Sequence, residues 1–138
     1  MNPFAAPQRL AKLTIEITTL CNLKCAGCPR TTAMAKGVWS DQHIPLERFQ
    51  RILDHIPYTE FVTLHGIGEP TLHPQFAELV AMAKASGKFG RMKMTTNALS
   101  RTVDYYAQSV AAGLDEFWVS VDSLDQAIAD QMRFGTKV

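Results

Sequence analysis

The sequence lacks the features that mark membrane, secreted and nucleic-acid-binding proteins. Among its 138 residues the longest apolar runs, such as residues 79–83, fall far short of the ~20 residues that a membrane span requires. Residues 1–4 show neither the charged nor the apolar region of a signal peptide. Lysine and arginine number 14 against 13 aspartate and glutamate, so the net charge of +1 provides no basic field for nucleic acid. We therefore expect a soluble, cytoplasmic protein with no membrane or nucleic-acid partner.

Cysteine is also scarce, and the three cysteines stand close together, at Cys21, Cys25 and Cys28. A disulfide between any two of them would close a very small loop and leave the third thiol free. The sequence therefore does not predict a disulfide scaffold. In a reducing compartment such a cluster indicates metal ligation or redox chemistry.

What the chain does contain is a regular alternation of strand-like and helix-like segments. The predicted strands cover residues 13–18, 61–65, 91–95 and 116–121. The predicted helices begin at Pro45, at Pro74 and near Thr102, and the last covers residues 124–132. This alternation is typical of βα units, so we expect one α/β domain with a parallel sheet and right-handed crossovers.

The spacing of apolar residues predicts which helix faces are buried. In the helix after Pro45, Phe49 and Leu53 recur at helical spacing on one face. In the helix near Thr102, the same spacing predicts that Val103, Tyr106 and Val110 point inward.

Each predicted strand is followed by a segment of unusual composition. The first is followed by the cysteines, the second by residues 66–70 (Gly-Ile-Gly-Glu-Pro), the third by residues 95–97 (Thr-Thr-Asn) and the fourth by residues 120–122 (Ser-Val-Asp). In parallel α/β folds the chemistry gathers just beyond the carboxyl ends of the strands. We therefore expect these four segments to share one rim.

The cysteine segment offers three soft thiolates, which bind iron–sulfur clusters, zinc or copper(I). A [4Fe–4S] cluster takes four ligands and the chain has no fourth cysteine, so one iron would keep an open position of the kind that catalysis uses. The alternative is a zinc site completed by a histidine, although none stands at a short, finger-like spacing from the cysteines. The histidines available for it are His43, His55, His65 and His73.

The pattern Cys-x3-Cys-x2-Cys after the first strand of a βα series resembles the signature of the radical S-adenosylmethionine (SAM) enzymes. The resemblance is to the branch with the SPASM-type peptide maturases and the molybdenum-cofactor cyclase. It implies that Cys21, Cys25 and Cys28 hold a [4Fe–4S] cluster whose fourth iron is chelated by SAM. It also implies that flavodoxin or ferredoxin reduces this cluster. Electron transfer from the cluster would then cleave SAM to a 5′-deoxyadenosyl radical, which takes hydrogen from a peptide or small-molecule substrate.

The other three rim segments are similar to further motifs of this family. Residues 68–70 are similar to its Gly-Gly-Glu-Pro turn, residues 96–98 to its Thr-Asn-Gly, and residues 120–122 to its Ser-x-Asp. Ile67 replaces the first glycine of the first motif, Ala98 replaces the glycine of the second, and Gly27 stands where an aromatic or bulky residue usually precedes the third cysteine. The resemblance implies that SAM is contacted by Gly68, Glu69, Thr96, Asn97, Ser120 and Asp122.

Simpler interpretations apply to several of these residues. Asn97 can cap a turn, and Asp122 or Ser123 can cap the helix that begins near Leu124. A dinucleotide-binding turn starting at Gly66 is disfavoured, because Thr71 occupies its third glycine position and Glu69 would repel a pyrophosphate.

Three other polar residues also invite catalytic roles. We interpret Arg30 as a solvated loop charge and His73 as part of a helix entrance, whereas His65 ends the second strand and can face the pocket. At the level of the whole chain, the alternative function is a module that holds zinc or a cluster and performs no chemistry.

The length bears on how much of a barrel the chain contains. A complete (β/α)8 barrel needs about 250 residues, and the resemblance implies a partial TIM-type barrel of six βα units. Four units are visible within residues 12–135, after a leader of residues 1–11, in a single domain spanning residues 1–138. We therefore expect the N-terminal part of a radical SAM core without its C-terminal part, or a minimal form that a partner chain completes.

Overall fold

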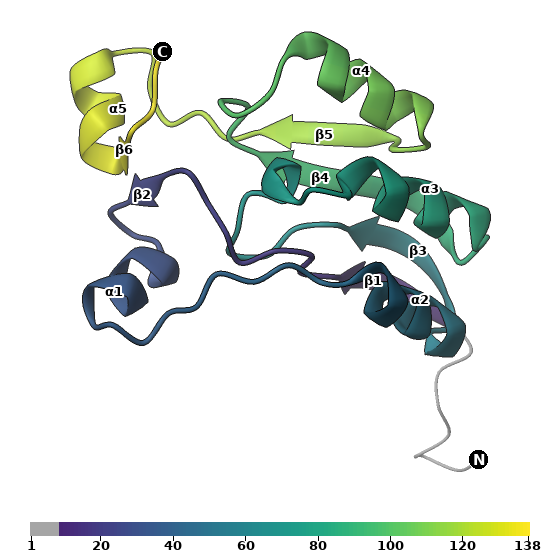
Figure 1. Cartoon of the computed structure of the whole chain (residues 1–138). Helices are drawn as coiled ribbons and strands as arrows, with labels where there is room; N and C mark the ends of the chain where they lie inside the picture. Colours follow the sequence, from purple (N-terminus) through teal and green to yellow (C-terminus); the bar gives the residue numbers. More distant parts are fainter. Residues whose placement is uncertain (1–8) are drawn as a thin grey trace.

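A computed structural model describes residues 9–138, and within that range a sheet of four parallel strands forms the framework (Figure 1). Its strands, in the order β1-β3-β4-β5, are β1 (Arg9–Thr14), β3 (Tyr58–Thr63), β4 (Phe89–Thr96) and β5 (Glu116–Val119). All neighbouring pairs are parallel, which confirms the predicted α/β class.

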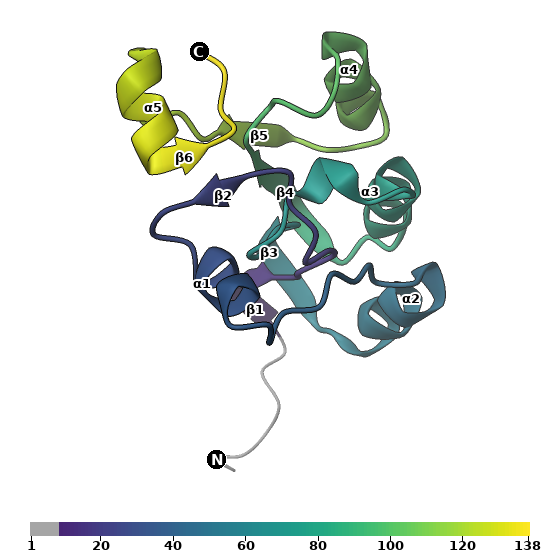
Figure 2. The ribbon, with the colours of Figure 1, turned by 60° about the vertical axis from the view of Figure 1, so that its left-hand side comes forward.

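Three helices cover one face of this sheet, as the two ribbon views show (Figures 1 and 2). They are α2 (Leu46–His55), α3 (Phe76–Ala85) and α4 (Val103–Ala111). Phe49 and Leu53 of α2 are buried as predicted, and they share the core with Val62 and Met92 of the sheet. No helix among residues 9–138 combines the length and the apolar character that crossing a membrane requires.

The first strand lies earlier in the chain than predicted. It runs from Arg9 to Thr14, and the backbone N–H of Ile15 still donates to the Thr63 carbonyl at 2.9 Å. The chain then leaves the sheet, and Ile17 and Thr18 pair with the segment before α2 instead, through the Ile44 N–H and a bridge to His43. The alternation in residues 13–18 therefore reflects a second extended pairing and not one continuous strand.

Three short elements around the cysteines have no counterpart in the prediction. Helix α1 (Pro29–Ala35) follows Cys28 directly, and β2 (Lys24–Cys25) pairs antiparallel with β6 (Arg133–Phe134). Strands of two residues carry no periodic pattern, and this pairing joins opposite ends of the chain. Contacts distant in sequence therefore hold the cysteine loop.

The last helix, α5 (Gln126–Met132), begins later than the predicted start near Leu124. The Asp125 carboxylate caps it by accepting the N–H groups of Ala127 and Ile128, so neither Asp122 nor Ser123 is the cap. In both ribbon views α5 lies with β6 at the rim beside β2, and not against the helix-covered face (Figures 1 and 2).

Helix α4 buries a different face from the predicted one. Val103 is 84% exposed and Val110 is 47% exposed, so the prediction that both point inward is wrong. Tyr106 is buried as predicted, and the neighbouring Tyr105 stacks on Phe76 of α3 with ring centroids 6.3 Å apart. Tyr106 packs on Phe117 of β5 with ring centroids 5.4 Å apart, so the two tyrosines, packed on α3 and β5, set the buried face of α4.

These burial values predict that replacing valine by alanine destabilises the protein much more at one helix position than at another. Val80→Ala in α3, where valine is fully buried, should lower the free energy of unfolding by about 2 kcal/mol, since it leaves a cavity. Val103→Ala in α4 should change it by less than about 0.5 kcal/mol. Urea unfolding followed by circular dichroism measures both, and equal losses would contradict the assignment of the α4 face.

Candidate functional site

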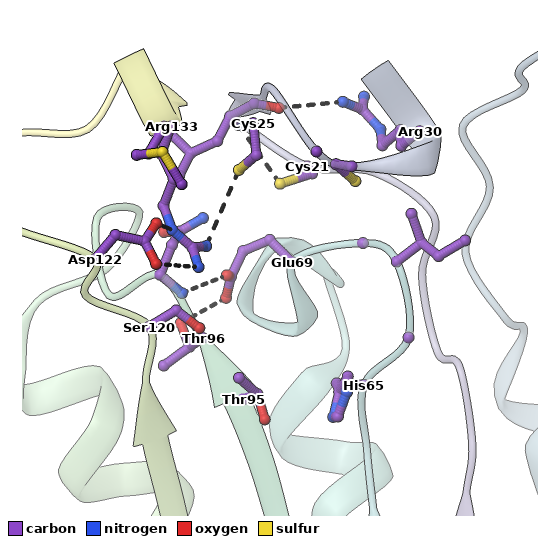
Figure 3. A pocket seen from close by; sticks show the side chains of 18 residues that line it. Cys21, Cys25, Arg30, His65, Glu69, Thr95, Thr96, Ser120, Asp122 and Arg133 are labelled. Carbon is purple, nitrogen blue, oxygen red and sulfur yellow. Dashed lines mark hydrogen bonds and ion pairs between the residues drawn. The ribbon is translucent and has the colours of Figure 1, made fainter. Parts of the chain in front are cut away.

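A cavity of about 410 Å³ opens at the carboxyl ends of the strands (Figure 3). The four rim segments predicted from the sequence all reach it. The predicted residues that line it are Cys21, Cys25, Cys28, Gly68, Glu69, Thr96, Asn97, Ser120 and Asp122. The structure thus brings together every residue predicted for the cluster or for SAM, while the group that each one binds stays a prediction.

The three cysteines are free thiols, each half-buried in the wall of this cavity. The Cys28 N–H donates to the Cys25 carbonyl at 3.2 Å, and the Leu23 N–H points at the Cys21 Sγ at 3.5 Å. Burial raises the pKa of the Cys21 thiol above its usual value. A positively charged ligand in the cavity would reverse that effect, because it favours the thiolate.

The donor set fits an iron–sulfur cluster. Within residues 9–138, no three His, Cys, Asp or Glu side chains converge on a point where one metal ion could bind. A multi-iron cluster has separate iron corners, each of which takes its own thiolate. Three thiols spaced along one cavity wall suit that requirement, and thiolates are the ligands that such clusters use.

The histidines of the zinc alternative are mostly engaged elsewhere. His73 has both ring nitrogens in use, with Nε2 2.9 Å from the Ile44 carbonyl oxygen and Nδ1 accepting the Gln75 N–H. His43 Nδ1 bonds Thr18 and His55 Nδ1 bonds the Arg51 carbonyl. Of the four histidines, all within the described residues, only His65 lines the cavity, and it lies across it from Cys21 and Cys25 (Figure 3).

The carboxylate of Glu69 accepts four hydrogen bonds at the rim. Its side chain is 3% exposed, and Oε1 accepts hydrogen bonds from the N–H and hydroxyl of Thr71 and from the hydroxyl of Thr96 at 2.6 Å. Oε2 accepts the Asn97 N–H at 2.8 Å. The carboxylate therefore joins the segment after β3 to the end of β4, and only Oε2 keeps capacity for a ligand.

Gly68 and Asn97 attach the cysteine loop to the same strand ends. A Cβ on Gly68 would overlap the Thr18 carbonyl oxygen, so only glycine allows this close approach. The Asn97 amide donates to the Asn22 side chain at 2.8 Å, while its oxygen accepts the Leu99 N–H as a turn cap. The turn cap that was the simpler interpretation of Asn97 is thus present, and the amide also reaches the cysteine loop, while its predicted contact with SAM stays a prediction.

Ala98 adopts a backbone conformation that favours glycine. Its φ is +59°, the only positive value among the non-glycine residues that the structure describes. This is the position where alanine replaces the glycine of the Thr-Asn-Gly motif. The turn therefore keeps its geometry at a conformational cost of about 1 kcal/mol.

Two arginines of the site have roles that the sequence did not indicate. Arg30 is 3% exposed, pairs with Asp41 at 3.0 Å and donates to the Thr19 carbonyl, so its prediction as a solvated charge is wrong. Its guanidinium also donates to the Leu23 carbonyl at 3.4 Å and so holds the cysteine loop.

Arg133 of β6 lines the cavity at its opposite edge. It forms an ion pair with Asp122, which lowers the pKa of that carboxyl, and its Nη1 lies 4.0 Å from the Cys25 Sγ (Figure 3). Asp122 thus already has a protein partner. The pairing of β2 with β6 brings Arg133 to the site, and no local pattern predicts that pairing.

Comparisons with known proteins agree on one family. A sequence profile of the Radical SAM superfamily matches residues 15–137. The tungsten-containing aldehyde ferredoxin oxidoreductase cofactor-modifying protein of Pyrococcus furiosus is 32% identical over 120 residues, covering 83% of this chain and 32% of the relative. The GTP 3′,8-cyclase of Cronobacter sakazakii is 32% identical over 128 residues, covering 88% and 38%. The chain spans about a third of the length of these relatives.

Solved structures show the same fold. BtrN in complex with AdoMet and 2-DOIA matches with a TM-score of 0.65 at 18% identity, over 89% of this chain and 52% of that chain. An open conformation of BtrN matches with a TM-score of 0.67 at 16% identity, over 88% and 54%. The partial-barrel architecture predicted from the sequence is that of these structures.

The hydrogen bonds of Glu69 predict a large effect from a change of a single atom. Glu69→Gln turns one acceptor into an N–H donor that faces other donors, and it should lower the free energy of unfolding by about 2 kcal/mol. The matched variant Glu78→Gln, on the exposed side of α3, should cost less than about 0.5 kcal/mol. Urea midpoints that moved equally in the two variants would show that Glu69 does not join the strand ends.

Proposed function

The chain belongs to the radical SAM superfamily, and from that premise we propose that its rim cavity binds a [4Fe–4S] cluster and SAM for reductive cleavage of SAM. Members of this superfamily are enzymes that use an iron–sulfur cluster and SAM. The observation that carries the proposal is that three free thiols and the ends of three further strand segments line one cavity. That arrangement gives one site for the cluster and its co-substrate together.

In this proposal Cys21, Cys25 and Cys28 hold three irons, and the fourth iron is left for SAM. The loop that carries them is attached on several sides, by Arg30, by the Asn22–Asn97 bond and by the pairing of β2 with β6. These attachments fix the positions of the three thiols relative to one another, which a cluster site requires.

The charges of the cavity wall match the two polar ends of the methionine part of SAM. All three nitrogens of the Arg30 guanidinium already donate, to the Thr19 and Leu23 carbonyls and to Asp41. Arg133 pairs with Asp122 through Nε and Nη2, but its Nη1 faces the Cys25 Sγ at 4.0 Å and can meet the SAM carboxylate from the cavity wall, which Ser120 also lines. The amino group of SAM would lie near Gly68 and donate to Glu69 Oε2, which accepts the Asn97 N–H and can accept a further hydrogen bond. Gly27 gives the adenine no side chain to pack against.

The cluster, when bound and reduced, supplies the electron that cleaves SAM into methionine and a 5′-deoxyadenosyl radical, which abstracts hydrogen from the substrate. We propose reduced flavodoxin or ferredoxin as the source of that electron, because the family uses such donors. The relatives' names mention GTP and the cofactor of a tungsten-containing oxidoreductase, and on that ground we propose a small-molecule substrate. A peptide substrate is the other candidate.

Anaerobic reconstitution with iron and sulfide tests the cluster. We expect about four irons and about four sulfides per chain, and a loss of most of both in Cys21→Ala, Cys25→Ala and Cys28→Ala. Ala26→Ser, an exposed change within the same loop, should retain the full content. About one zinc per chain without sulfide would contradict the proposal.

Incubation of the reduced, reconstituted chain with SAM tests the reaction. We expect 5′-deoxyadenosine, measured by chromatography, and at least a tenfold lower rate in Arg133→Gln with an unchanged iron content. A chain that holds the cluster but releases no 5′-deoxyadenosine would favour the non-catalytic module instead.

A further inference from the structure

The sheet face opposite α2, α3 and α4 carries polar side chains in ordered rows. The strand register places Lys93 between Thr63 and Glu116, and Thr95 beside Trp118 one row closer to the rim. His65 follows Thr63 by two residues, so it belongs to the same face and to the row of Thr95. The interior of a (β/α) barrel is ordinarily filled by branched apolar residues. Polar rows here indicate a surface that receives a polar ligand.

Lys93 is a half-buried cation that forms no salt bridge, although Glu116 lies beside it on the next strand. Its ammonium lies 3.6 Å from the centre of the Trp118 ring, and it forms no ion pair with any residue in the described range 9–138. The adjacent carboxylate is already engaged, because Glu116 pairs with Arg91 through one oxygen and accepts the Trp118 indole N–H through the other. The Trp118 ring thus contacts one side of the Lys93 ammonium, and the N–H donors of the ammonium remain available to a ligand.

His65 offers a second unused polar group, between Lys93 and the rim cavity. Its Nδ1 is shielded from solvent and has no hydrogen-bond partner among the described residues, so a ligand in the cavity would meet the ring through Nε2. Burial, and then the charge of Lys93, lower the pKa of His65, which keeps the ring neutral at neutral pH. Glu16, the other charged neighbour of His65, accepts the Ile67 N–H at 2.6 Å. His65 itself lines the cavity proposed for SAM.

We propose that the substrate carries an acidic group, a carboxylate or a phosphoryl group, which Lys93 binds on this face while His65 hydrogen-bonds the part nearer the rim. The proposal rests on the proposed function, since it assigns a substrate class to the same site. An ammonium that is partly shielded from water and forms no salt bridge interacts favourably with an incoming anion. Anchoring at Lys93 would direct the remainder of the substrate past His65 and Thr95 toward the cavity.

Anion binding can be measured on the full 138-residue chain without iron or SAM. The chain has two tryptophans, so Trp39→Phe leaves Trp118, the ring under Lys93, as the fluorescent reporter. Inorganic phosphate and acetate are titrated separately, with chloride keeping the ionic strength constant. We expect a saturable change in Trp118 emission with at least one anion. In Lys93→Gln the dissociation constant should rise at least tenfold.

Lys12→Gln is the matched control, because Lys12 is an exposed lysine on the same face of β1, away from Trp118. Its dissociation constant should stay within twofold of the parent, and circular dichroism confirms that each variant is folded. A response to phosphate alone assigns a phosphoryl group, and one to acetate alone assigns a carboxylate. No saturable response to either anion, or an equal response in Lys93→Gln, would overturn the proposal. A failed cluster reconstitution beside intact anion binding would instead count against the proposed function.

Discussion

The carboxylate of Glu69 accepts hydrogen bonds from the segment after β3 and from the end of β4, and the geometry of the rim depends on this junction. Its backbone N–H donates to the Leu20 carbonyl at 2.8 Å, so the same residue also holds the chain that leads into the cysteines. A buried carboxylate with this many donors is stable only while all of them remain in place. Two strand ends and the cysteine loop are therefore fixed relative to one another before any ligand binds.

The parts of this structure that follow from local pattern were predictable from the sequence. The buried faces of α2 and α3 come from apolar residues at helical spacing, and the parallel sheet comes from the alternation of strands and helices. The rim was predictable for a topological reason, since parallel strands must end on the same side. Each motif could therefore be assigned to one cavity without knowledge of a single contact in it.

The remainder depends on contacts between residues far apart in the chain. Arg30 looks like any loop arginine until the fold brings Asp41 and the Thr19 carbonyl around it, and Arg133 reaches Cys25 through a pairing of two-residue strands. Tyr105 and Tyr106 rotate α4 because their rings pack on α3 and β5, a tertiary effect that overrides the valine spacing. In each case the deciding partner lies in another element, where a local pattern carries no information.

The central claim is that one cavity holds both an iron–sulfur cluster and SAM, with the amino acid end of SAM on the iron that lacks a thiolate. Electron–nuclear double resonance on the reduced, reconstituted chain tests it directly, using SAM isotopically labelled at its amino nitrogen and carboxylate oxygens. We predict hyperfine coupling of both labels to the cluster. A cluster that forms and a SAM molecule that binds, with neither label coupled, would contradict the claim.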